Sequence, residues 1–105
     1  MKLIFAIIND DDVRFVSDAL IQKEIQATRL SSTGSFLKSG NTTILICIDD
    51  DKVDTAIEVI RSHCRKRKQL LPSHAVSGAF STYPIEITVG GATVFVTDVE
   101  RFEKF

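Results

Sequence analysis

The segment from Thr33 to Thr43 holds the residue types best suited to chemistry, because it combines aromatic, amide, hydroxyl and glycine residues. Phe36 and Leu37 stand between glycine-containing sequences at Gly34 and Gly40. A phenyl ring can stack on a nucleobase, amide and hydroxyl groups recognise base edges, and glycine lets backbone N–H groups approach a phosphate. The composition is therefore compatible with a nucleotide-binding loop. It is equally compatible with a loop that packs on a neighbouring subunit, and residue types alone leave both interpretations open.

Two aspartate runs, at positions 10–12 and 49–51, are the candidate metal ligands. Each run directly precedes an expected helix, where carboxylates cap free N–H groups and suit the helix dipole. Their spacing also differs from that of a calcium-binding EF-hand loop. His63 and His74 lack a nearby cysteine or histidine at metal-ligand spacing. We therefore expect helix capping at both runs and no metal site.

Catalytic patterns are missing from the sequence: no serine lies in a G-x-S-x-G elbow, and no cysteine–histidine pair stands out. We expect a protein that is not an enzyme. The basic run from Arg65 to Lys68 is interpreted as the solvated end of a helix, where cations suit the dipole. The alternative interpretation is a contact for an anion or an acidic partner.

The chain has 105 residues, a formal net charge of -1 and 44% apolar residues, which predicts one domain over residues 1–105. This balance argues against a nucleic-acid or membrane partner. The apolar N-terminal run is too short for a signal peptide or a membrane span. Cys47 and Cys64 follow no metal or redox spacing, so we expect reduced thiols and a cytoplasmic location.

The elements that position these residues follow from hydrophobic periodicity. Strands are expected over 3–8, 27–33, 42–48 and 85–96, the last interrupted at Gly90-Gly91. Helices are expected after each aspartate run, up to about Lys23 and over 53–64. A long loop covers 71–84, and Val99 to Phe105 is expected to form one last helical turn.

The element order predicts an α+β fold, the ferredoxin-like βαββαβ arrangement, with a four-stranded antiparallel sheet and both helices on one face. The strands at 3–8 and 42–48 are nevertheless apolar on both faces. The face without helices would expose a large apolar patch. Each large aliphatic side chain left in water forfeits roughly 1.5–3 kcal/mol. We therefore expect a homo-oligomer built over that face.

Two long strings resemble the PII-like cyclic di-AMP receptor family: ATRLSSTGSFLKSGNTT at residues 27–43 and VGGATVFV at residues 89–96. The opening residues 1–4 and the closing residues 102–105 are also similar to this family. The resemblance implies a homotrimer of PII-like signal transduction subunits that bind cyclic di-AMP at subunit interfaces. It implies a smaller loop between the second and third strands and a larger one before the fourth. Ligand binding is expected to order these loops for an unknown downstream protein.

The resemblance also implies ligand contacts, at positions where this chain has the residues typical of the family: Ala27, Thr28, Gly34, Phe36, Leu37, Asn41 and Phe95. Three further contact positions differ, because the chain has Gln26 in place of arginine and Ser35 and Cys47 in place of glycine. Gln26 lacks a cation that could stack on adenine, and Cys47 adds a side chain where the backbone approaches the ligand. The alternative hypothesis is a PII-like adaptor that has lost nucleotide binding and acts only through protein contacts.

Overall fold

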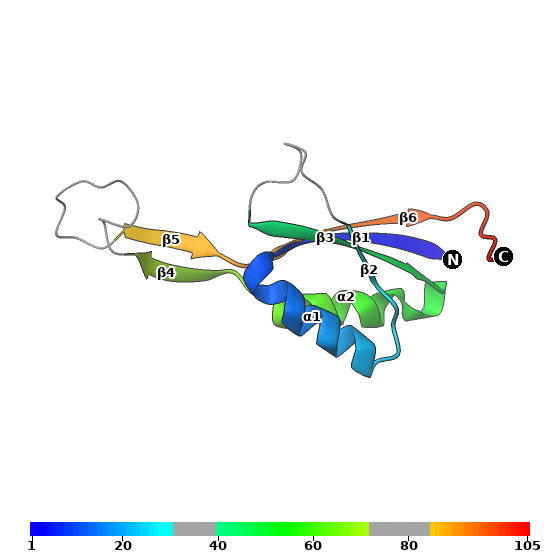
Figure 1. Cartoon of the computed structure of the whole chain (residues 1–105), viewed down its shortest axis with the longest axis horizontal. Helices are drawn as coiled ribbons and strands as arrows, with labels where there is room; N and C mark the ends of the chain where they lie inside the picture. The colour runs from blue at the N-terminus through cyan, green and yellow to red at the C-terminus, as the bar shows by residue number, and fades with distance from the viewer. Residues whose placement is uncertain (31–39, 72–84) are drawn as a thin grey trace.

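The computed structural model describes residues 1–30, 40–71 and 85–105. Figure 1 shows an elongated molecule in which a two-stranded arm extends from a body of sheet and helices. Along the chain the elements are β1 (Lys2–Asn9), α1 (Asp10–Gln22), β2 (Thr28–Leu30), β3 (Asn41–Ile48), the 3-10 turn η1 (Asp50–Lys52), α2 (Val53–His63), β4 (Arg67–Leu71), β5 (Ile85–Val89) and β6 (Ala92–Asp98).

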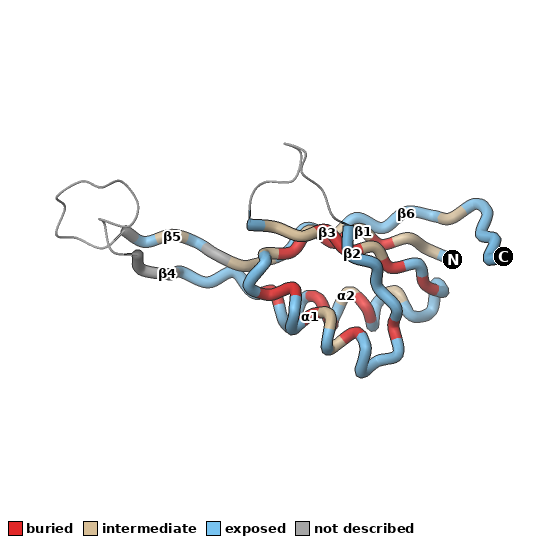
Figure 2. The backbone as a smooth tube through the Cα atoms, viewed as in Figure 1, coloured by how far each residue is buried: buried red, intermediate tan, exposed pale blue. Residues whose placement is uncertain are grey.

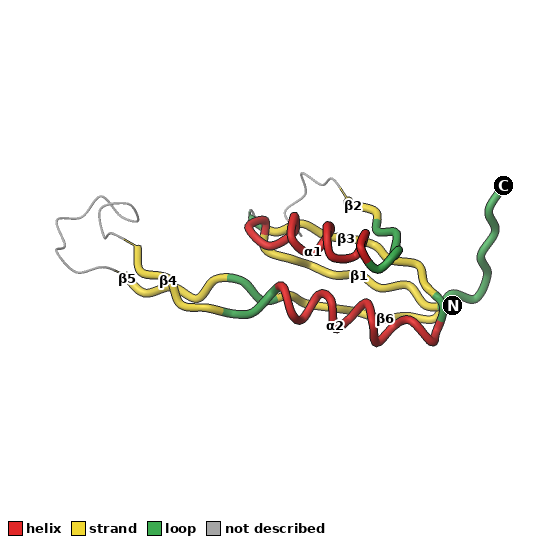
Figure 3. Tube along the Cα trace, turned by 90° about the horizontal axis from the view of Figure 1, so that it is seen from below, coloured by secondary structure: helices red, strands yellow, loops and turns green. Residues whose placement is uncertain are grey.

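The main sheet has four strands in the order β2-β3-β1-β6, and all its pairings are antiparallel. Both helices lie side by side across one face of this sheet, as Figure 3 shows from the helix side. The predicted α+β, ferredoxin-like arrangement is confirmed. The second and third strands of this arrangement, β2 and β3, pair antiparallel with Thr28 opposite Leu45.

The core lies between the sheet and the two helices, where Figure 2 colours many residues as buried. Alternate residues of β1 supply its centre, because Ile4, Ala6 and Ile8 are fully buried while the residues between them are only half-buried. Val16 and Leu20 of α1 pack against this layer. Each large side chain buried in this way stabilises the fold by roughly 1.5–3 kcal/mol.

The aspartate runs take positions slightly different from those expected. Asn9, not an aspartate, is the N-cap of α1, and its side-chain oxygen accepts a hydrogen bond from the Asp11 amide at 2.9 Å. The first run therefore forms the first turn of α1, where negative charge suits the helix dipole. In the second run, Asp49 makes no capping hydrogen bond. Asp50 instead pairs with the N-terminal amino group of Met1 at 2.7 Å.

The segment between α2 and β6 corrects two predictions. The helix ends at His63, and Arg67 and Lys68 belong to β4, so the basic run is not a helix end. β4 pairs with β5 in a separate two-stranded sheet, the β4–β5 arm. The predicted strand over 85–96 is therefore two strands in two sheets, divided at Gly90 and Gly91. Both glycines have positive φ angles, of 84° and 80°, a backbone conformation that favours glycine, at the point where the chain passes from one sheet to the other.

The predicted helical turn over 99–105 is wrong, because these residues form neither helix nor strand. The Val99 amide donates to the Met1 carbonyl at 3.1 Å, which ties the start of this tail to the N-terminus. Within residues 1–30, 40–71 and 85–105, no helix has the length and apolar character needed to cross a bilayer.

Candidate functional site

The sheet face opposite the helices, called here the open face, carries most of the expected ligand contacts that the structure describes. Its side chains alternate with the buried ones, so they come from the odd-numbered residues of β1, β3 and β6. The register forms one row across all four strands: Thr28, Leu45, Phe5 and Phe95. Expected contacts thus stand at both ends of a row whose middle is apolar.

The open face leaves aromatic and aliphatic groups exposed to solvent in the single chain. Phe95 is 57% exposed and Leu30 is 39% exposed, while Phe5 in the same region is only half-buried. Cys47 is also exposed, one row away, opposite Leu3. A contiguous apolar area of this kind is typical of a surface that binds a partner or ligand.

Gln26 and Ala27 are positioned by the way α1 ends. The Ile25 amide donates to the Leu20 carbonyl and the Glu24 amide to the Ile21 carbonyl, both at 2.9 Å, which is a Schellman motif. Glu24 has a φ angle of 59°, a left-handed conformation at a position that glycine usually occupies in this motif. Ile25 is buried behind it. The chain is therefore fixed immediately before the expected contacts begin.

Two cavities meet at Gln26 on this side of the body. One, of about 240 Å³, is lined by Gln26 and Cys47 together with Met1, Ile48 and Lys52. The other, of about 530 Å³, is lined by a continuous stretch that includes Gln26, Ala27 and Thr28. The structure therefore brings Cys47 close to three consecutive predicted site residues that lie about twenty positions earlier in the chain: Gln26, Ala27 and Thr28.

Asn41 lies at the other end of β3, six residues from Cys47, which corresponds to roughly 20 Å along a strand. It follows Gly40, whose carbonyl accepts a hydrogen bond from the Asp10 amide at 2.8 Å. The next hydroxyl, Thr42 Oγ1, donates to Asp10 Oδ1 at 2.5 Å. The first turn of α1 thereby holds the start of β3. Gly34, Ser35, Phe36 and Leu37 lie outside the described residues.

The same turn of α1 holds the base of the β4–β5 arm, a contact that sequence reasoning missed. Asp12 is buried, and its two carboxylate oxygens accept from the Arg67 guanidinium at 3.2 and 3.4 Å. Gly90 packs so closely here that a Cβ atom would lie 2.5 Å from the Arg65 carbonyl oxygen. The sequence offered one sign of this site, the adjacent pair Gly90-Gly91, which we interpreted only as a strand interruption.

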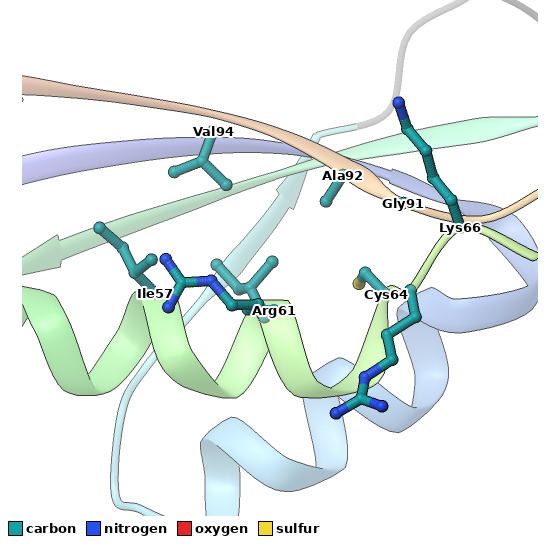
Figure 4. Close-up of a pocket in the computed structure, with 9 residues that line it drawn as sticks. Ile57, Arg61, Cys64, Lys66, Gly91, Ala92 and Val94 are labelled. Atoms are coloured by element: carbon teal, nitrogen blue, oxygen red, sulfur yellow. The ribbon is translucent and has the colours of Figure 1, made fainter.

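A third cavity, of about 420 Å³, lies on the helix side between α2 and β6 (Figure 4). Ile57, Val94 and the buried Cys64 contribute apolar walls, and burial together with the nearby Asp12 charge raises the pKa of the Cys64 thiol to about 11. The Arg61 guanidinium at its edge is paired with Glu58 at 2.8 Å. The cavity contains none of the predicted ligand contacts. Among the described residues, no cluster of acidic, histidine or cysteine side chains could hold a metal ion.

Comparisons with known proteins identify the family of this chain. A family model described as "Cyclic-di-AMP receptor" matches residues 1–105. A crystal structure described as a functionally unknown protein from Pediococcus pentosaceus ATCC 25745 superposes with a TM-score of 0.76 at 40% sequence identity. That match covers 99% of this chain and 96% of the other chain. The chain belongs to the cyclic-di-AMP receptor family.

Proposed function

We propose that this protein is a signalling receptor that binds cyclic di-AMP on its open face, in sites completed by a second copy of the chain. The observation that carries the proposal is the row Thr28, Leu45, Phe5 and Phe95, which joins expected contacts from both edges of the sheet. The family supports the ligand, since its members are described as cyclic-di-AMP receptors.

Separation of the contacts supports a shared site. Thr28 lies on edge strand β2 and Phe95 on edge strand β6, three strand spacings apart, which is roughly 14 Å. An adenine that is hydrogen-bonded by Thr28 therefore lies far from Phe95 of the same chain. A neighbouring copy would supply Phe95 instead. The homotrimer implied by the family resemblance would repeat this arrangement and would cover the exposed apolar groups.

Each contact has a role that suits its chemistry. Phe36 and Phe95 would stack on the adenines, while Thr28 and Asn41 would hydrogen-bond their edges. The backbone from Gly34 to Leu37 would hold phosphate. The remaining expected contacts would line the rest of the binding site: Gln26, Ala27, Ser35 and Cys47. Gln26 and Cys47 would lower the affinity for cyclic di-AMP relative to arginine and glycine at these positions.

Signal relay would follow from ordering of the two loops around the ligand. The first turn of α1 supports this role, since Asp10 contacts the start of β3 and Asp12 contacts the base of the β4–β5 arm. A conformational change at the ligand loop would thereby be transmitted through α1 to the β4–β5 arm. A downstream protein in the cytoplasm would then recognise the altered surface. The whole chain would act as one domain without catalytic activity.

Isothermal titration with cyclic di-AMP tests the proposal directly. We expect saturable binding by the unmodified protein and weaker binding by Phe95→Ala and Asn41→Ala, each by about tenfold for a lost contact of about 1.4 kcal/mol. Phe15→Ala is the matched control, because Phe15 is an exposed aromatic residue on α1, away from the open face. Absence of binding by the unmodified protein would contradict the proposal. If Phe95→Ala and Phe15→Ala change the Kd for cyclic di-AMP equally, the ligand does not bind on the open face.

Recovery of binding separates the receptor from an adaptor that has lost its ligand. If only the double variant Gln26→Arg/Cys47→Gly binds cyclic di-AMP, the protein is an adaptor rather than a receptor. If the unmodified protein binds and the double variant binds more tightly, the receptor proposal stands.

A further inference from the structure

Thr43 is the one buried side chain among the described residues whose polar atom has no hydrogen-bond partner. It lies in β3, is only 6% exposed, and its Oγ1 meets no donor or acceptor. A buried hydroxyl without a partner destabilises a fold by about 1–3 kcal/mol. Native structures contain few such groups, and each calls for a specific explanation.

The neighbours of Thr43 place its side chain among the expected ligand contacts of the open face. Thr43 stands on the open face, two residues from Asn41, and roughly 7 Å separates such residues along a strand. In the register it lies opposite Leu30 of β2 and Ile7 of β1. The next open-face row contains Thr28. Thr43 thus lies between the two residues expected to hydrogen-bond the adenine edges.

A purely structural role explains Thr43 poorly. Its cross-strand partners Leu30 and Ile7 are aliphatic, so valine, which has nearly the same shape, would suit this position better. The neighbouring Thr42 differs, since its hydroxyl is bonded to Asp10. A group that lowers stability in the free protein is commonly retained at a functional site, where it gains its partner on binding.

We propose that the Thr43 hydroxyl is a further ligand contact, which forms its hydrogen bond with a polar group of the bound nucleotide. The inference rests on the proposed function and adds a residue that neither the family resemblance nor the cavities identified. Because the hydroxyl is covered in the free chain, the atoms that cover it must shift when the nucleotide binds, and the new bond then supplies the partner that Thr43 lacks.

Thr43→Val tests the inference because its two expected effects have opposite signs. Without ligand, the variant should melt at a temperature about 4 °C or more above that of the unmodified protein, because an unpaired buried hydroxyl is removed. With ligand, its Kd for cyclic di-AMP should be weaker by about fivefold to tenfold, for one lost hydrogen bond. Melting is followed by circular dichroism at a fixed protein concentration, and binding is followed by isothermal titration.

Two companion variants make the result specific. Thr43→Ser keeps the hydroxyl and should keep the Kd within about twofold, even though the lost methyl lowers the melting temperature. Thr93→Val is the matched control, since Thr93 stands in the same row on β6 but its hydroxyl is exposed to water. Thr93→Val should change neither quantity by more than a small amount.

The possible failures are distinguishable. If the unmodified protein does not bind cyclic di-AMP, the proposed function fails and this inference with it. If it binds and Thr43→Val binds equally well, the inference alone is wrong. If Thr43→Val melts below the unmodified protein, the hydroxyl already has a partner in the free assembly, which also overturns the inference.

Discussion

Gly90 is the position at which a single methyl group should detach the β4–β5 arm from the body. It has a φ angle of 84°, and a Cβ added there would lie 2.5 Å from the Arg65 carbonyl oxygen and 2.6 Å from Arg67 Nη1. The first of these atoms is backbone, which cannot rotate away. The second belongs to the guanidinium that binds Asp12. Gly90→Ala should therefore break the contact between α1 and the arm.

Gly40 provides the matched control for this substitution. Its φ angle is 96°, yet an added Cβ would meet nothing within 4 Å. Alanine at either glycine adopts an unfavourable backbone conformation, which costs about 1–3 kcal/mol. Only at Gly90 does steric overlap add a further ~1–3 kcal/mol. Because 1 kcal/mol shifts the melting temperature of a domain this size by about 4–8 °C, Gly90→Ala should melt at least ~4 °C below Gly40→Ala.

Circular dichroism melts and amide hydrogen exchange measure the two consequences. The melts compare Gly90→Ala with Gly40→Ala at equal protein concentration. Hydrogen exchange in β4 and β5 should accelerate in Gly90→Ala and stay unchanged in Gly40→Ala, because local opening precedes global unfolding. Equal melting temperatures for the two variants, or an arm that exchanges as slowly as in the unmodified protein, would refute the packing described for Gly90.

Three further predictions follow from particular residues. Glu24→Gly should raise the free energy of unfolding by about 1 kcal/mol in urea titrations, since it relieves the φ angle of 59° in the Schellman motif; a destabilised variant would contradict that conformation. Unfolding free energy should fall as pH rises from 9.0, the ordinary pKa, through about 11, the raised pKa of Cys64, because the unfolded thiol loses its proton first. Cys64→Ala should abolish this decrease in unfolding free energy. If Cys64→Ala shows the same pH profile as the unmodified protein, the decrease does not come from the Cys64 thiol. Gln26→Arg and Cys47→Gly should each tighten cyclic di-AMP binding by isothermal titration, the arginine through a cation–π contact of about 0.5–2 kcal/mol, and weakened binding in both would place the ligand elsewhere.

Periodicity predicted the main sheet because burial of the core leaves a simple trace in sequence. The continuous apolar run over residues 3–8 gave β1, and the helical spacing around Ile60 gave α2. The open apolar face also followed from sequence, because β1 and β3 are apolar on both sides. Register then placed Thr28 and Phe95 at opposite edges, which no local pattern could show.

The β4–β5 arm was missed because β4 begins with charged residues and the arm is held to the body by distant contacts. Arg67 is charged and follows a helix, so local rules favoured a solvated helix end. Its buried partner Asp12 lies 55 residues earlier in the chain, and only the folded structure brings them together. The final turn was wrong for a related reason, since apolar spacing in residues 99–105 was too short to specify a helix.

Thr43 illustrates a residue that sequence reasoning treated as an ordinary member of a hydroxyl-rich segment. Its unusual property is the missing partner, which depends on the aliphatic residues placed beside it by β1 and β2. A buried hydroxyl that lowers stability because it has no partner is the kind of feature that indicates a functional role.

Sedimentation velocity with cyclic di-AMP, followed by adenine absorbance, tests whether each ligand site is built from two copies of the chain. The chain contains no tryptophan and one tyrosine, so the nucleotide would dominate the ultraviolet signal. We expect the nucleotide to sediment with an assembly of several 11.7 kDa chains. Nucleotide that stays unsedimented, or that moves with a single chain, would contradict a site built from two copies.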